Sequence, residues 1–144
     1  MGRIAKETTI RAPQQAVFDY VSDLTKHPQW GQHNNSVVAE TAGPVKVGSK
    51  YETTNHQFGT HVEPVTVTDY NPPSSFGYES TGTIGIVRHG FELTSAGDGA
   101  TRVTKWMDVT KPSLLVKLFG PVIMRGAPAA IEEDLRRIKA KLES

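Results

Sequence analysis

The C-terminal segment carries a narrow stripe of aliphatic side chains at helical spacing. Ile131, Leu135, Ile138 and Leu142 follow one another at i, i+4, i+7 and i+11, which places them on one face of an α-helix. Acidic residues come early in this segment and basic residues late, an order that suits the helix dipole. Full burial of such a stripe stabilises a fold by ~6–12 kcal/mol, which is comparable to the net stability of a small domain. We therefore expect a long C-terminal helix on which the rest of the chain closes.

The segment before this stripe is apolar on every side of a helix. Between Leu114 and Met124 only Lys117 carries a charge, and Pro121 and Pro128 interrupt the helical pattern because proline lacks a backbone donor and clashes with the preceding turn. Three interpretations fit: a buried, kinked core helix, a roof or gate over a ligand cavity, and a surface that docks on a partner or membrane. The segment is too short and too broken to span a bilayer, so we expect no stable membrane insertion.

The rest of the chain predicts one strand, two short helices and about six further strands. Ile4 to Arg11 is rich in β-branched residues and indicates the first strand, a helix starts at Ala12-Pro13, and Thr25 caps a second helix that runs through Trp30. After this second helix the spacing of the apolar residues changes to a period of two, which indicates strands. The further strand candidates are Val37 to Glu40, Ser49 to Phe58, His61 to Asn71, Ser74 to Ser80, Thr83 to Ser95 and Ala100 to Thr110. Their short connections favour antiparallel hairpins, and a sheet of this size must curl around the single long helix, which usually leaves a space between them.

Composition limits the classes of function. A chain of 144 residues fits one domain, which we place at 1–144. A net charge of +1 with 22% charged residues gives no sign of a nucleic-acid partner. The absence of cysteine excludes disulfides, a thiol nucleophile and a Cys-ligated metal. The N-terminus lacks the apolar run of a signal peptide, so we expect a cytoplasmic protein.

Short motifs occupy the caps, turns and core positions of these elements. They are Ile10-Arg11-Ala12-Pro13, His27-Pro28-Gln29-Trp30, Val47-Gly48-Ser49, Tyr70-Asn71-Pro72-Pro73 and Gly99-Ala100-Thr101-Arg102-Val103. Their order resembles the START-like (SRPBCC) superfamily, the polyketide cyclase/dehydrase and lipid-transport group. The resemblance implies an α+β helix-grip fold, in which a seven-stranded antiparallel sheet curls around a long C-terminal helix, with two short helices after the first strand. It also implies a hydrophobic small-molecule ligand, such as a lipid or polyketide, and it assigns no catalytic residue.

Strand alternation and aromatic content predict which side chains face the cavity. His89 shares a strand face with Val87 and Phe91, and this is the inward face if Phe91 belongs to the core. Aromatic rings suit an apolar pocket, and tyrosine and tryptophan add a polar group. The candidate ligand-binding residues are Trp30, Tyr51, His56, His61, Tyr78, His89, Phe91, Met107, Phe119, Ile123 and Ala127.

Two histidines in one predicted hairpin raise the question of a metal. A tight turn at Phe58-Gly59 would place His56 opposite His61, with Glu63 on the same face two residues further on. Two histidines and a carboxylate can bind a metal, but no spacing motif supports one here, so we expect neither a metal nor another cofactor. The histidines are then a solvated hairpin tip or, if they face the cavity, polar anchors or acid–base groups.

The remaining polar features are three single side chains and one acidic run. We expect His27 at the surface as a cap residue and His33 at a cavity rim. Alternation places Lys105 on the inward face of its strand, where a lysine needs a partner or a ligand anion; we favour a side chain that reaches out past the sheet edge. The run Glu132-Glu133-Asp134 indicates a solvated helix face.

Three functions from different classes fit these observations. The first is a binding module that holds an apolar ligand between sheet and helix. The second is a cyclase/dehydratase-type enzyme in which His89, His56, His61 or a tyrosine such as Tyr51 or Tyr78 shuttles protons. The third is a docking module that uses residues 114–124. No nucleophile elbow or P-loop is present, and the sequence leaves a homodimer open.

Overall fold

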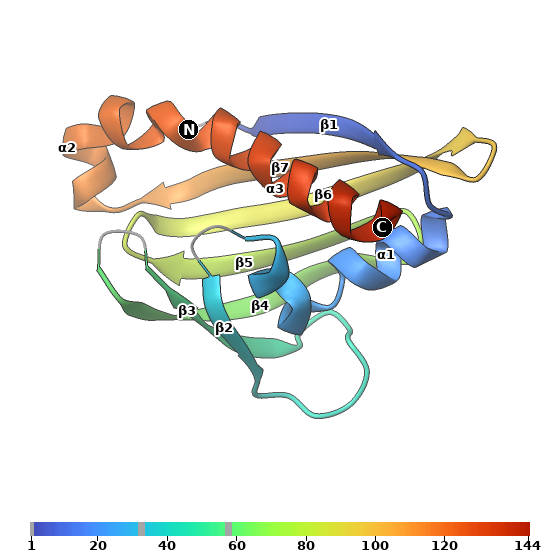
Figure 1. The fold of residues 1–144 in the computed structure, drawn as a ribbon. Coiled ribbons are helices and arrows are strands. Elements are labelled where there is room, and N and C mark those ends of the chain that lie inside the picture. The colour runs from blue at the N-terminus through green and yellow to red at the C-terminus, as the bar shows by residue number, and fades with distance from the viewer. Residues whose placement is uncertain (1, 32–33, 57–58) are drawn as a thin grey trace.

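The structure is a computed structural model and describes residues 2–31, 34–56 and 59–144. Figure 1 shows a sheet with the last helix lying along one face. In chain order the elements are β1 (Ile4–Ile10), α1 (Gln14–Val21), the 3-10 helix η1 (Leu24–Gln29), β2 (Asn34–Ala39), β3 (Lys50–Asn55), β4 (His61–Asn71), β5 (Ser75–Gly82), β6 (Gly85–Gly97), β7 (Ala100–Pro112), α2 (Leu114–Ile123), the 3-10 helix η2 (Met124–Gly126) and α3 (Ala127–Glu143).

The strands form a seven-stranded antiparallel sheet in the order β1-β7-β6-β5-β4-β3-β2. The first strand therefore pairs with the last, and the chain crosses from one edge of the sheet to the other through α1 and η1. Strands β2 to β7 follow as consecutive hairpins, as their short connections predicted. The predicted α+β helix-grip fold is confirmed, including the two short helices after the first strand.

Helix α3 packs on the sheet through the predicted stripe. Ile131 and Leu135 are each 2% exposed and Ile138 is fully buried, while Leu142 packs against the margin of the core. The same core takes in Phe18 from α1 and the inward side chains of the strands. Burial of this stripe supplies a large share of the apolar area that closes the fold.

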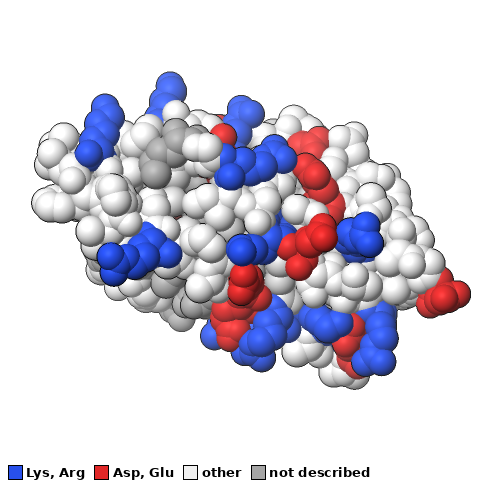
Figure 2. Space-filling model, turned by 90° about the horizontal axis from the view of Figure 1, so that it is seen from above, with Lys and Arg blue, Asp and Glu red and all other residues white. Residues whose placement is uncertain are grey.

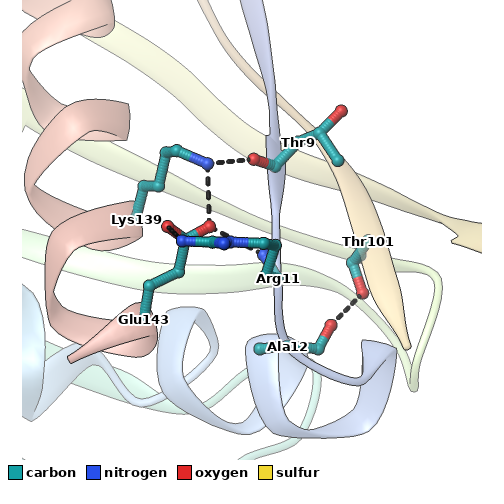
Figure 3. A network of polar contacts seen from close by, with 6 residues as sticks. All are labelled: Thr9, Arg11, Ala12, Thr101, Lys139 and Glu143. Carbon is teal, nitrogen blue, oxygen red and sulfur yellow. Dashed lines mark hydrogen bonds and ion pairs between the residues drawn. The ribbon is translucent and has the colours of Figure 1, made fainter. Parts of the chain in front are cut away.

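A polar network fastens the end of α3 to the end of β1 (Figure 3). Lys139 Nζ donates to the carbonyl oxygen of Thr9 at 2.6 Å and lies 2.7 Å from the Glu143 carboxylate. The same carboxylate accepts from the backbone N–H of Arg11 at 2.8 Å. The hydrogen bond from Lys139, followed by that from Arg11, lowers the pKa of Glu143 to about 2. The C-terminal end of the helix is thereby held in register with the first strand.

Helix α2 is mostly exposed rather than buried. Ser113 caps it by accepting from the backbone N–H of Val116, and non-helical backbone at Phe119 together with Pro121 kinks it. Its exposed apolar side chains are Leu114 (70%), Leu118 (65%), Phe119 (55%) and Val122 (70%). A buried core helix is therefore the wrong interpretation for this segment.

The stretch Leu114–Glu143 is also long and apolar enough, by composition alone, to cross a membrane. Its most apolar window has a mean hydropathy of 1.5, and 17% of that window is buried in the protein. The kink in α2 and the 3-10 turn of η2 interrupt this stretch, and its second part supplies the buried stripe on α3.

Several predicted boundaries differ from the observed ones. β3 ends at Asn55, and β6 begins at Gly85 rather than Thr83. Gly85 has a φ of +113° and a Cβ there would overlap the Lys111 carbonyl, so the turn before β6 depends on glycine. The cap of η1 is Asp23 rather than Thr25, because the Asp23 carboxylate accepts from the Thr25 N–H.

Candidate functional site

A cavity of about 430 Å³ lies between the sheet and the C-terminal helical segment. Strands β5, β6 and β7 form one wall, and η2 with the first half of α3 forms the other. The rest of the lining comes from the connection between β5 and β6, from Asn55 on β3 and Glu63 on β4, from Ile123 at the end of α2, and from Trp30 and Gly31 after η1. Its volume suits a small organic molecule.

A row of three inward side chains crosses the sheet wall. Tyr78 on β5 lies opposite His89 on β6, and His89 lies opposite Met107 on β7. The rings of Tyr78 and His89 stack with centroids 4.9 Å apart and planes 14° from parallel. His89 Nε2 is 3.3 Å from Ser80 Oγ. The period of two along each strand brings these polar groups to one surface of the cavity.

Burial changes the acid–base properties of this row. It lowers the pKa of His89 to about 3, with smaller contributions from Lys105 and His27. It also raises the pKa of the Tyr78 hydroxyl. Near neutral pH the imidazole and the phenol are therefore both uncharged, and they serve as hydrogen-bonding groups of low basicity and low acidity.

A buried ion pair links the sheet to α3. Lys105 Nζ lies 3.6 Å from Asp134 Oδ2, and the two side chains are only 6% and 14% exposed. The ammonium group also lies 5.6 Å from the ring centroid of Trp30 and 5.9 Å from that of Phe91. Burial lowers the pKa of Lys105, and Asp134 acts in the opposite direction.

Two expectations about this pair are wrong. Lys105 does not reach past the sheet edge, because β1 covers that side of β7. Asp134 does not belong to a solvated face, because it lies one helical turn from Ile131 on the flank of the buried stripe. The helical spacing from Ile131 was the available signal for Asp134, although nothing in the sequence paired it with Lys105.

Glu63 contributes a second carboxylate to the cavity wall. It is 8% exposed and accepts from the Thr83 backbone N–H at 3.4 Å. Burial raises its pKa, against smaller opposing effects from Thr83, His61 and Asn55. A Cβ at Gly82 would overlap the Glu63 carboxylate, so the glycine makes room for it.

The predicted hairpin register of the two histidines is wrong. Asn55, and not His56, lies opposite His61, because β3 ends at Asn55 and the pairing is shifted by one residue from the predicted one. His56 is exposed, with Nδ1 3.1 Å from Thr60 Oγ1. Residues Gln57 and Phe58 lie outside the described part of the chain. Across residues 2–31, 34–56 and 59–144, no three His, Cys, Asp or Glu side chains come close enough to hold a metal ion.

The structure separates the candidate ligand-binding residues into two groups. Those that line the cavity are Trp30, Tyr78, His89, Met107, Ile123 and Ala127. Those placed elsewhere are Tyr51 and Phe91 in the core, His56 and Phe119 at the surface, and His61, half-buried on β4. Contact of any of them with a ligand stays a prediction.

His27 is a core residue rather than a surface cap. Its side chain is 1% exposed, Nε2 lies 3.0 Å from the Val21 carbonyl oxygen, and its ring is 4.4 Å from that of Trp30. Burial lowers its pKa to about 3. The turn of η1 directs the ring beneath Trp30, which a cap motif alone does not reveal. His33 lies outside the described residues.

The fold and cavity define a helix-grip α+β protein with an internal site. The chain belongs to the family described as Polyketide cyclase / dehydrase and lipid transport, whose model matches residues 1–143. No curated protein matches the chain.

Solved structures share the fold at low sequence identity. A START superfamily protein from Mycobacterium smegmatis has a TM-score of 0.81 at 16% identity, over 98% of this chain and 97% of that one. A hypothetical protein from Helicobacter pylori has a TM-score of 0.79 at 8% identity, over 98% and 88% of the two chains. The di-domain ARO/CYC StfQ from the steffimycin biosynthetic pathway has a TM-score of 0.71 at 14% identity, over 97% of this chain and 44% of StfQ.

Proposed function

We propose that this protein binds a hydrophobic small molecule, such as a lipid or polyketide, in the cavity between the sheet and α3. The observation that carries the proposal is the 430 Å³ space, in which apolar side chains such as Trp30, Met107 and Ile123 lie together with polar groups. A concave site that combines apolar and aromatic side chains with convergent polar groups is the usual form of a ligand site. Membership of a cyclase and lipid-transport family supports the same conclusion.

Binding is a better explanation of the site than proton-transfer catalysis. A general acid or base works best when its pKa lies near the operating pH. His89 has a pKa lowered to about 3 and Tyr78 has a raised one, so neither is suited to proton shuttling near neutrality. Tyr51, His56 and His61, the other candidates for that role, do not line the cavity. We therefore rank the cyclase/dehydratase alternative below binding.

Fluorescence titration with Nile red, an apolar dye, tests the binding proposal. Ala127 lies at the start of α3 in the cavity lining, so Ala127→Phe should fill the cavity and weaken dye binding at least about tenfold. Ala140→Phe on the exposed side of the same helix is the matched control and should bind like the wild type. Equal binding by both variants would place the dye outside the cavity.

We also propose, as a second candidate, that α2 docks on the surface of an anionic membrane. Its exposed apolar side chains adjoin Ile123 and Met124, which line the cavity. The chain has no acidic residue between Asp108 and Glu132, whereas Lys111, Lys117 and Arg125 are exposed. In Figure 2 the left end of the molecule, where Figure 1 places α2, shows Lys and Arg but no Asp or Glu. Apolar side chains with flanking cations favour an interface of anionic lipids.

Sedimentation with lipid vesicles tests this docking. The protein should sediment with vesicles that contain phosphatidylglycerol and less with pure phosphatidylcholine vesicles. Leu118→Glu should abolish sedimentation and leave the melting temperature unchanged, because Leu118 is 65% exposed. Failure of the wild type to bind anionic vesicles would refute this candidate, and unfolding of the variant would show that Leu118 is structural.

A further inference from the structure

The charged groups that line the cavity leave no cation available for an anionic ligand. Among the described lining residues, Lys105 is the one basic side chain besides His89. Its ammonium group is already paired with Asp134 at 3.6 Å, and both side chains are nearly inaccessible. The His89 imidazole is close to Ser80 Oγ and stacked on Tyr78, and its burial keeps it neutral near pH 7.

The buried carboxylate of Glu63 makes the charge of the cavity lining unfavourable for an anionic ligand. This carboxylate lines the same cavity, and no lysine or arginine lies beside it in that lining. A ligand carboxylate would have to lose its hydration, approach Glu63 and compete with Asp134 for Lys105. Burial of a charge without a partner costs several kcal/mol, whereas a neutral hydrogen-bonding group costs far less when it finds a partner.

We propose that the cavity selects neutral ligands, in which an apolar body carries a hydroxyl, carbonyl or amide group, over carboxylates with the same apolar body. This inference rests on the proposed function, since it assigns the ligand class of that cavity. The imidazole of His89 and the hydroxyl of Ser80 are two of the uncharged groups in the lining that can form hydrogen bonds with such a ligand.

Displacement of bound Nile red by decanol and by decanoate tests the selectivity. The two compounds share one alkyl chain, and the acid is ionised at pH 8. Decanol should displace the dye from the wild type at a concentration at least about tenfold lower than decanoate. Asp134→Asn leaves Lys105 without its carboxylate, so it should shift the ratio toward decanoate by at least about tenfold.

Two further variants separate cavity charge from other effects. Glu132→Gln removes an exposed carboxylate from the same helix outside the cavity lining, and it should keep the wild-type ratio. Glu63→Gln removes the second cavity carboxylate without leaving a lysine unpaired. It should also shift the ratio toward decanoate, and it keeps the test decisive if Asp134→Asn fails to fold.

The outcomes distinguish this inference from the proposed function. Equal or stronger displacement by decanoate from the wild type would overturn the inference alone. An unchanged ratio in every folded cavity variant would also overturn it, because the selectivity would then not arise from cavity charge. Failure of Nile red to bind the cavity would overturn the proposed function and this inference together.

Discussion

His27 and His89 both lie in surroundings that lower their pKa values to about 3, mainly through burial. An unfolded histidine takes up its proton near pH 6.5. Between about pH 6.5 and pH 3 the unfolded state therefore binds more protons than the folded state. The contribution of each histidine to stability is fully present above pH 6.5 and is lost as the pH falls, by up to ~1.4 kcal/mol per pH unit.

The variant His89→Gln should weaken this pH dependence. Glutamine keeps a hydrogen-bonding group near Ser80 but does not titrate. From pH 7 to pH 5 the free energy of unfolding should fall more in the wild type than in the variant, by up to about 2 kcal/mol, as measured by urea denaturation. The raised pKa of Glu63 acts in the opposite direction but is common to both proteins. Parallel curves would contradict a buried, neutral His89.

Single residues show where sequence reasoning succeeds and where it stops. Strand alternation placed His89 and Met107 on the inward face, where both line the cavity. It also placed Lys105 inward, but the partner of Lys105 comes from a distant helix. A sequence period specifies the face of an element on which a side chain lies, and it does not specify which element packs opposite. Contacts between elements, such as those of Asp134 and His27, were therefore missed.

Among the elements, α3 covers the core through its buried stripe. Leu135 lies in the middle of its stripe and is 2% exposed, so Leu135→Ala should lower the free energy of unfolding by ~2–5 kcal/mol. Lys141→Ala on the exposed side of the same helix is the control and should change it by less than about 0.5 kcal/mol. Chemical denaturation measures both. A loss well under about 1 kcal/mol for Leu135→Ala would mean that α3 does not close the core.

The order and type of the elements were predictable, whereas the surroundings of α2 were not. Periods of two and 3.6, with turn residues between them, carry the information on strands and helices. An all-round apolar helix has the same composition whether it is buried or meets another surface. The exposure of Leu114 and Val122 therefore depends on where the chain places α2, beyond the β5–β6 end of the sheet, and not on the helix itself.

In the whole molecule, the cavity is the feature on which the proposed function depends. Its volume depends on how far the sheet curls and on how many side chains from opposite walls fill the space. Neither quantity follows from the pattern of a single element, so the sequence predicted a cavity but not its size. Two predictions are left untested by the structure: that residues 1–144 form one domain and that the protein is cytoplasmic.

Mass spectrometry of captured small molecules tests directly whether the cavity between the sheet and α3 holds an apolar ligand. The protein is incubated with a mixed lipid extract, repurified and denatured, and the released compounds are compared with those from Ala127→Phe and Ala140→Phe. We expect apolar compounds to be enriched in the wild type and in Ala140→Phe and depleted in Ala127→Phe, because Ala127 lines the cavity and Ala140 does not. The same compounds in equal amounts from all three proteins would contradict a ligand site between the sheet and α3.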